Sequence, residues 1–367
     1  MNNMIKLDLQ LFAEGAGHLV NTTQNYVNAY NGTAISFHGT DTLAPEIKQF
    51  YDLTLLDKAR PNLRYHKFAK KKNIPQGHGH TIEFRTVNKF VNAEQLTEGV
   101  IPAGQKAGVS HITATVNQFG LYTAVSDMLE LQSIDDLILA FTEEMGYSAS
   151  NTIDLLMRDA LLVGTNVLYC DNINVLTGAV VSTPTSCATM HSVRSNTTNG
   201  FAALTVNAVQ KAVTALKAAD AKPFEDGKYV AIIHPYTAYD IMQDPNWVDA
   251  HKYAQPKELY DGELGEIAGV RFVESTNAPI LNSALYKNAE ETSTFATFIF
   301  GPDAYGASAL EGAAMETIVK PKEMIGGPLN QFSTIGYKLT FGGVILQPTA
   351  LIRVMSCSEY SATATPN

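Results

Sequence analysis

The feature that most constrains this chain is a long run of helical periodicity between Ser133 and Val163. Ser133 precedes an apolar run and Asp136 follows three residues later, which resembles a capping box at a helix start. Gly164 stands where such a helix would end. The apolar positions recur every three or four residues, at Leu137, Phe141, Met145, Ala149, Ile153, Leu156 and Ala160. A helix over 133–163 would be about 45 Å long, far above the usual length.

A helix of this length is compatible with two architectures. With one narrow apolar face it is a strut across a flat, extended domain. Alternatively, it is a core helix of an ordinary α/β enzyme, interrupted at Gly146. Polar residues fall largely off the apolar stripe, and we expect them away from the buried face: Asp135, Glu143, Glu144, Asp154, Arg158 and Asp159.

Composition limits the class of protein. The 367 residues are enough for two or three domains, and 45% hydrophobic with 17% charged residues predicts a real core and a weakly charged surface that subunits can bury. The net charge of −10 provides no overall basic field, so any relation to nucleic acid would be containment rather than adhesion. The three cysteines, Cys170, Cys187 and Cys357, have no C-x-x-C spacing, which fits a reducing cytoplasm without disulfide framework or structural zinc.

The start of the chain is not expected to be a signal peptide. Its short apolar patch is broken by Asp8 and Gln10, unlike a signal peptide, and no apolar run approaches the 18 residues of a membrane span. Residues 1–44 are rich in Asn, Thr, Gly and Ala, which predicts an extended arm or a floppy terminus. An amphipathic helix is expected within 45–68, and the basic run Lys70-Lys71-Lys72 is typical of a solvated face.

Two strands with a long insert follow. Residues 81–87 and 111–117 alternate polar with apolar or β-branched side chains, as half-buried strands do. The polar insert between them is too long for a tight turn, and loops of that length are usually functional or disordered. We therefore predict a long β-hairpin that projects from the body.

The middle of the chain predicts a compact α/β lobe. Helices are expected over 205–219 and 236–242, and apolar runs at 229–234, 270–274 and 295–300 predict buried strands. Closing strands are expected within 337–355. There is no internal repeat.

Catalytic motifs are mostly missing. No phosphate-binding loop, dinucleotide fingerprint, zinc-protease motif, nucleophile elbow or calcium loop occurs. His78-Gly-His80 lacks a third metal ligand and predicts a glycine-rich turn. His234 ends a predicted strand, where α/β enzymes often place catalytic groups, but a structural histidine is the simpler interpretation. The acidic residues Glu258, Asp261, Glu263 and Glu266 predict solvated charge, and Trp247 a loop anchor.

Several phrases of the sequence resemble a known family. They are Leu9-Gln-Leu-Phe-Ala-Glu14, Leu96-Thr-Glu-Gly-Val100 with Pro102, Val230-Ala-Ile-Ile-His-Pro235 and Gly265-Glu-Ile-Ala-Gly-Val270. With the order of arm, hairpin, long helix and α/β lobe, they resemble the major capsid proteins of tailed double-stranded-DNA bacteriophages, and the subfamily that includes coliphage N-four. The similarity covers nearly the whole chain.

The resemblance implies an α+β capsid fold. It implies an N-terminal arm (1–60), an extended hairpin (74–120), a peripheral domain (61–73, 121–204 and 321–356) with its spine helix at 133–163, an axial domain (205–320) and a C-terminal tail (357–367). The subunit would assemble in the host bacterial cytoplasm into hexamers and pentamers of an icosahedral virion shell around double-stranded DNA. Scaffolding, portal and decoration proteins would be possible partners, with no cofactor, catalysis or membrane.

Contacts between subunits are expected at the hairpin and at one position of the lobe. The candidate residues are Leu96, Glu98, Val100, Pro102, Lys106 and Trp247. Some family members crosslink a hairpin lysine to an asparagine, and Lys89 and Lys106 lie in that region, but no motif singles either out and crosslinking is not predicted. Two alternatives remain: a nanocompartment shell of the same fold around protein cargo, and a cytoplasmic α/β enzyme that uses His234 and the acidic loop 258–266.

Overall fold

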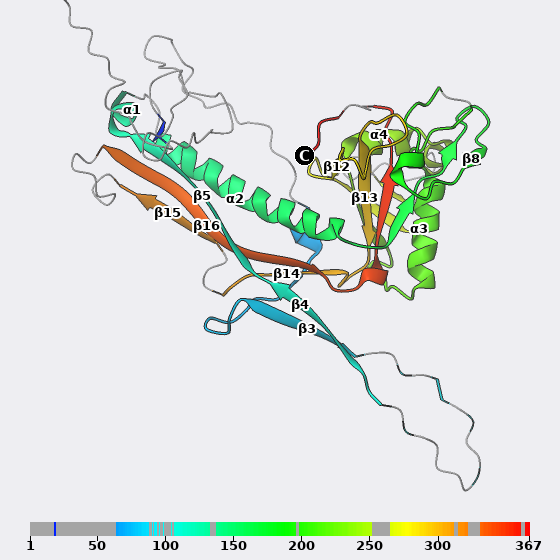
Figure 1. Cartoon of the computed structure of the whole chain (residues 1–367), viewed down its shortest axis with the longest axis horizontal. Coiled ribbons are helices and arrows are strands. Elements are labelled where there is room, and N and C mark those ends of the chain that lie inside the picture. Colours follow the sequence, from blue (N-terminus) through cyan, green and yellow to red (C-terminus); the bar gives the residue numbers. More distant parts are fainter. Residues whose placement is uncertain are drawn as a thin grey trace, which may run out of the picture. The chain divides into compact units, whose positions relative to one another are not determined.

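The structure is a computed structural model of the whole chain. It describes residues 18–19, 64–87, 106–132, 137–195, 198–251, 265–311, 315–321, 331–360 and 364–367, with a few residues between 90 and 104. The chain divides into two compact units (Figure 1). The first comprises Met1–Ala59, Gln118–Asn151 and Ala313–Thr340, and the second Arg60–Asn117, Thr152–Gly312 and Phe341–Asn367.

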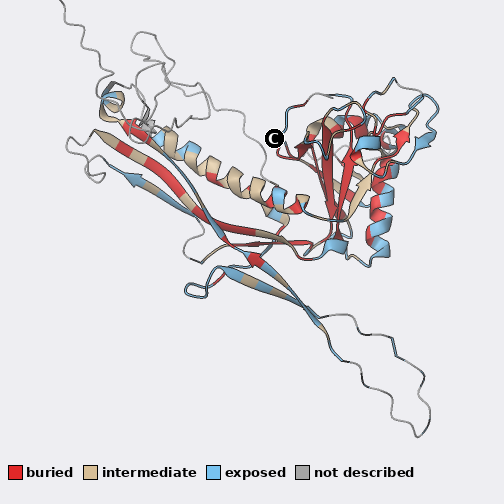
Figure 2. Ribbon diagram, in the orientation of Figure 1, coloured by how far each residue is buried: buried red, intermediate tan, exposed pale blue. Residues whose placement is uncertain are grey.

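The second unit is built on a seven-stranded mixed sheet, in the order β10-β11-β9-β13-β17-β6 with β12 beside β13. Its strands are β6 (Val167–Tyr169), β9 (Tyr229–Ile233), β10 (Glu266–Ile267), β11 (Val270–Glu274), β12 (Ile280–Leu281), β13 (Thr294–Phe300) and β17 (Leu351–Ser356). β9 runs parallel to β11 and antiparallel to β13. The apolar runs are thus confirmed as strands, and every residue of β9 and β13 is buried (Figure 2).

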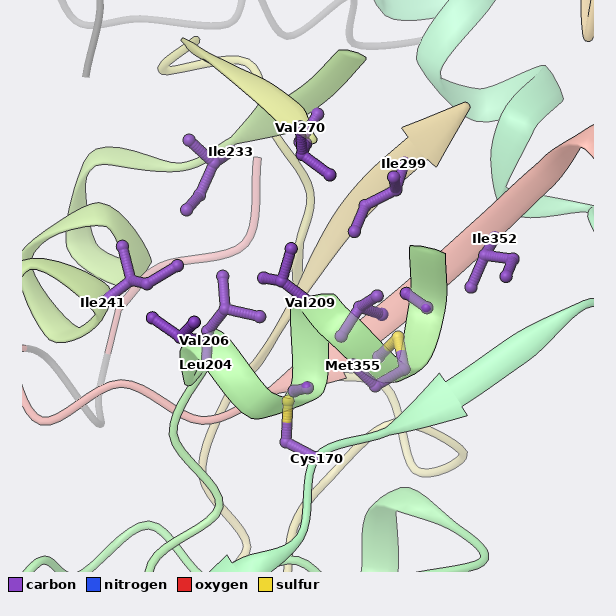
Figure 3. Close-up of a cluster of buried hydrophobic side chains, with 14 of the residues drawn as sticks. Cys170, Leu204, Val206, Val209, Ile233, Ile241, Val270, Ile299, Ile352 and Met355 are labelled. Atoms are coloured by element: carbon purple, nitrogen blue, oxygen red, sulfur yellow. The ribbon is translucent and has the colours of Figure 1, made fainter. Parts of the chain in front are cut away.

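Three helices accompany this sheet: α3 (Val206–Ala218), α4 (Pro235–Met242) and α5 (Pro245–His251). The first two confirm the predicted helices. Thr205 caps α3, because its side chain accepts a hydrogen bond from the Ala208 N–H at 3.4 Å. Val209 of α3 shares one buried cluster with Ile233 of β9 and Ile299 of β13 (Figure 3). The sequence did not predict α5, because a proline is as suitable for a helix start as for a stop.

The sheet draws on chain segments outside 205–320. β6 pairs parallel with β17, and β17 pairs antiparallel with β13. β6 precedes this range in the chain and β17 follows it, and both strands complete the sheet of the lobe. Accordingly, the segment Phe341–Asn367 belongs to the second unit.

The second unit also holds shorter strand pairs. Its other strands are β2 (Lys70–Lys71), β3 (Thr81–Val87), β4 (Val109–Thr115), β7 (Asn172–Ile173), β8 (Val180–Ser182) and β14 (Tyr305–Ser308). Single 3-10 turns are η2 (His66–Phe68), η3 (Cys187–Thr189) and η6 (Pro348–Ala350). The basic run lies on β2 and just after it, and its side chains are exposed, as predicted for a solvated face.

The first unit combines a sheet with the long helix. Its elements are β1 (His18–Leu19), β5 (Asn117–Ser126), α1 (Asp127–Gln132), α2 (Leu137–Leu162), β15 (Met315–Lys320) and β16 (Phe332–Ile345). β16 lies between β5 and β15. The division between the units falls inside α2 and β16, so each of these elements contributes to both units.

The long helix is confirmed as α2. Its 26 residues correspond to about 39 Å, and it continues through Gly146. Residues 133–136, including the predicted cap Ser133, lie outside the described residues, and the short helix α1 before them was not predicted. No helix among the described residues is long and apolar enough to cross a membrane.

The expected polar face of α2 is partly wrong. Asp154 and Arg158 are buried, together with Met157 and Leu161. These four follow the i, i+3, i+4, i+7 spacing of a single helix face. Glu143, Glu144 and Asp159 are exposed, as expected. The prediction failed because charged side chains were assigned to solvent, whereas Asp154 and Arg158 are buried with hydrogen-bond partners.

Several predictions fall outside the described residues. The arm over 1–60 does so apart from His18 and Leu19, which pair parallel with β5. The amphipathic helix expected within 45–68 does so up to residue 63, and the described remainder is the single turn η2. Most of the hairpin insert between 88 and 105 lies outside as well.

Candidate assembly surface

The hairpin ribbon, which we define as β3 and β4, confirms the two predicted strands. The strands pair antiparallel over their whole length, from Thr81 opposite Thr115 to Val87 opposite Val109. Side chains alternate between the two faces, so Glu83, Arg85 and Val87 share one face with their partners on β4. The ribbon is a separate two-stranded sheet.

This ribbon is exposed along most of its length (Figure 2). Of its fourteen positions only Ala114 is buried. The cross-strand pair Val87 and Val109 is 62% and 47% exposed, and Phe90 beyond it is also exposed. An isolated two-stranded hairpin is marginally stable in water, and exposed apolar side chains at its end favour a covering surface.

Charged groups on the ribbon contribute little to its stability. Glu83 lies 2.7 Å from His111 Nδ1 and 3.3 Å from an Arg85 nitrogen, and all three side chains are well exposed. Solvent screens such pairs, so each is worth at most about 1 kcal/mol. The ammonium group of Lys72 lies 5.7 Å from the centre of the Phe84 ring. The ribbon therefore offers mixed apolar and charged contacts, which suit recognition of another protein surface.

A second exposed surface, the open sheet face, lies on the first unit. It is formed by Tyr122 of β5, by Gly336 and Lys338 of β16, and by Ile318 of β15, around a shallow hollow of about 500 Å³. A Cβ at Gly336 would lie 2.8 Å from the Leu121 carbonyl oxygen, so only glycine allows β5 this close. Glu316 and Lys338 face each other across the strands at 3.4 Å. The sequence missed this surface, because β5 was not recognised as a strand and its pairing with β16 is remote in sequence.

The predicted contact residues are placed unequally. Leu96, Val100 and Pro102 lie outside the described residues, while Glu98 and Lys106 are described and exposed. The structure adds the valine pair at the end of the ribbon. In the sequence, this pair could have been found from the alternation of polar and apolar residues that predicted the two strands.

Trp247 is buried within its own unit. Its indole packs edge-to-face on Phe272, with ring centres 5.5 Å apart, and joins the main core cluster. It anchors α5 rather than a loop. Its role in a contact between subunits stays a prediction.

His234 is a structural residue. It stands at the N-cap of α4, where its Nδ1 accepts a hydrogen bond from the Tyr236 N–H at 3.1 Å. Burial lowers the pKa of His234 to about 4, so the imidazole is neutral near pH 7. Its ring packs against Tyr236 and Phe295. This geometry confirms the structural interpretation.

The other candidate site residues form no catalytic or metal cluster in the part of the chain that the structure describes. Gly77 and Gly79 beside the two histidines have φ of +85°, which confirms the glycine-rich turn. Glu266 forms an ion pair with Lys228, whereas 258–264 lies outside the described residues. Within the described ranges, no group of three or more His, Cys, Asp or Glu side chains is arranged to hold a metal ion.

Solved structures share this fold over most of the chain. The capsid of Helicobacter pylori bacteriophage KHP30 matches with a TM-score of 0.63 and 12% identity, over 88% of this chain and 99% of that one. The cyanophage Pam1 capsid gives 0.62 and 14%, over 86% and 97%. The capsid of Ralstonia phage GP4 gives 0.59 and 13%, over 90% and 100%. At these identities the similarity shows the fold, which confirms the predicted α+β capsid architecture.

A search of curated proteins gives no match. A family model described as phage capsid protein matches residues 111–354. That segment covers well over half of the chain, from β4 to β17, including α2 and the lobe. The enzyme alternative is therefore wrong, and the chain belongs to the family of phage capsid proteins, the structural proteins of the virion shell.

Proposed function

We propose that this capsid protein self-associates into hexamers and pentamers of an icosahedral shell that encloses double-stranded DNA. The observation that carries the proposal is the exposure of the hairpin ribbon, whose end presents Val87 and Val109 to solvent. Burial of apolar area is the main driving force of association between subunits. Closed symmetric assembly from one chain requires such surfaces on every copy.

The proposed division of labour follows the segments of the chain. The arm (1–60) and the hairpin (74–120) reach over neighbouring subunits, and the peripheral domain carries the spine helix. The axial domain, around 205–320 with β6 and β17 completing its sheet, lies at the centre of each capsomer. The sequence phrases quoted above support a place near the subfamily of coliphage N-four.

The charge of the chain supports containment of DNA rather than tight binding. With a net charge of −10, the subunit has no overall basic field for phosphates. A weakly binding wall lets the packaged DNA enter and leave. Scaffolding, portal and decoration proteins are the other partners that we propose, on the resemblance alone.

A matched pair of variants tests the ribbon. Val87→Asp places a charge on the exposed valine pair, whereas Thr86→Asp places it on the opposite face of the neighbouring position, which is also exposed. Assembly is measured by light scattering and negative-stain microscopy, and folding by circular dichroism. We expect Val87→Asp to reduce assembly much more than Thr86→Asp, with both chains folded. Equal assembly of the two variants and the wild type would contradict the role of the ribbon.

A further inference from the structure

One segment of the second unit, residues 172–193, lacks acidic and basic side chains other than one histidine. Residues 172–193 contain no Asp, Glu, Lys or Arg, although 17% of the whole chain is charged. Several of their apolar side chains are nevertheless exposed: Val175, Leu176, Val180, Val181 and Val193. Depletion of charge with exposed apolar side chains is typical of the core of a protein interface.

The exposed part of this segment is a rigid hairpin, β7–β8. Its turn is closed by hydrogen bonds from the Gly178 N–H to the Asn174 carbonyl (2.7 Å) and from the Asn174 N–H to the Ala179 carbonyl (2.9 Å). The Asn174 side chain accepts a further bond from the Leu176 N–H at 3.0 Å. Leu176 stands at the tip and is 82% exposed.

The base of the hairpin is fixed by one buried side chain. Asn172 is fully buried, and its amide nitrogen donates to Ser182 Oγ and to the Thr189 carbonyl, both at 2.9 Å. Its side-chain oxygen accepts from the His191 N–H at 3.0 Å. The tip is therefore held in one position before any partner arrives, which lowers the entropic cost of binding.

A cavity of about 660 Å³ lies against one face of the same hairpin. Ile173 and Val180, which pair across the strands, line it on the hairpin side. Phe201, Pro245 and Ile267 line it elsewhere, together with the charged side chains of Arg194, Asp240 and Asp244. Val181 follows Val180 in the strand, so its side chain belongs to the opposite face.

The hairpin thus lines a cavity with one face, to which Val175 and Gly178 of its turn also belong, and presents Leu176 and Val181, which do not line the cavity, to solvent. A head-to-tail contact needs two different complementary surfaces on each copy, and repetition of such a contact closes a ring. We infer that the Leu176 tip of one copy enters the cavity of the next copy, around the axis of a capsomer. The Leu176 side chain matches the apolar part of the mixed lining, at Phe201, Pro245 and Ile267, and the occupant is a second copy of this chain. This inference rests on the proposed self-assembly and specifies one of its contacts.

A cysteine pair tests the contact directly. Leu176→Cys is combined with Asn246→Cys, because Asn246 is exposed and lines the cavity. The control combines Asn246→Cys with Leu285→Cys, since Leu285 is 84% exposed in the same unit but does not line the cavity. Burial raises the pKa of the thiols of Cys170, Cys187 and Cys357, so these buried native cysteines give little background.

Assembled particles of both double variants are treated with diamide and separated on a non-reducing gel. We expect a ladder of covalent oligomers from the Leu176 pair, at about tenfold higher yield than from the Leu285 pair, because the contact raises the effective concentration of the two thiols. A ladder that stops at dimers would overturn the head-to-tail arrangement. Particles without the ladder would overturn this contact while leaving self-assembly intact.

Single variants provide a second readout. Leu176→Asp should reduce ring and shell formation relative to Leu285→Asp, with an unchanged melting temperature, because both side chains are exposed in the isolated chain. Normal assembly of Leu176→Asp would overturn the inference. Failure of the wild-type chain to assemble under any condition would instead overturn the proposed function, and with it this contact.

Discussion

Asp154 and Asn277 are joined by a buried hydrogen bond, although 123 residues separate them in the chain. The Asn277 amide donates to Asp154 Oδ2 at 3.3 Å, and the His66 N–H donates to Asp154 Oδ1 at 3.2 Å. One turn further along α2, Arg158 donates to the Asn277 carbonyl at 3.4 Å and to Asn367 Oδ1 at 3.2 Å. The end of α2 that belongs to the second unit is therefore held to remote loops by polar groups, in addition to apolar packing.

Removal of the Asp154 carboxylate should destabilise the protein strongly. Asp154→Ala leaves the His66 N–H and the Asn277 amide without this acceptor. Each buried donor left without its partner costs about 1–3 kcal/mol. The measurement is the free energy of unfolding in urea. Glu143→Ala on the exposed side of α2 is the control, and a similar loss for both variants would contradict the importance of this network.

Substitution of two glycines by alanine should change the stability of the protein in opposite directions. At Gly146 no atom lies within 4 Å of the position that a Cβ would take, so Gly146→Ala should stabilise α2 by about 0.5–1 kcal/mol through helix propensity. At Gly336 the new methyl group would lie 2.8 Å from the Leu121 carbonyl oxygen, and we expect destabilisation of about 1–3 kcal/mol. Thermal unfolding of the two variants decides the signs. A tolerated Gly336→Ala would show that β5 and β16 are not packed this closely.

His234 should make the protein less stable in acid. Its pKa falls from the ordinary 6.5 to about 4 because the ring is buried, so the unfolded chain gains a proton before the folded one. The contribution of the neutral His234 ring to the stability of the protein is fully present above pH 6.5. It declines by about 3 kcal/mol as the pH falls toward 4. His234→Asn keeps a capping side chain and removes the titration. Urea unfolding at about pH 7 and about pH 4.5 should show a smaller decline for this variant, and an unchanged decline would contradict the assignment.

Asp240 should act in the opposite direction. Burial raises its pKa from 3.8 to about 6, against hydrogen bonds from Ser358 and the Glu359 N–H, which lower it. As the pH rises, Asp240 loses its proton at a higher pH in the folded state than in the unfolded chain. The contribution of the protonated carboxyl group to stability is therefore fully present below pH 3.8, and it is lost, by about 3 kcal/mol, as the pH rises to about 6. Asp240→Asn should therefore be more stable than the wild type at about pH 7 and equal to it near about pH 3.5. If Asp240→Asn and the wild type were equally stable at both pH values, the raised pKa of Asp240 would be refuted.

Much of the fold was predictable because local periodicity reflects burial. The apolar runs that became β9 and β13 are covered on both faces, and the alternating runs that became β3 and β4 are not. The buried face of α2 was not predictable in its polar part. Asp154 and Arg158 find their partners near residues 66, 277 and 367, and no spacing within the helix reveals partners so remote in sequence.

The candidate surfaces were predictable to different degrees. The ribbon followed from alternation, whereas the cavity beside β7–β8 collects residues from 173 to 267 and has no local signal. The lack of charge over 172–193 is visible in the sequence itself. The exposure of its apolar side chains has no signal in the sequence and is visible only in the structure.

The central claim is that copies of this chain associate with one another into a closed shell. Negative-stain microscopy with light scattering on the purified protein, over a range of concentrations, tests it most directly. We predict closed shells, tubes, or rings of five or six subunits. A chain that remains a monodisperse monomer or dimer at high concentration would contradict the claim.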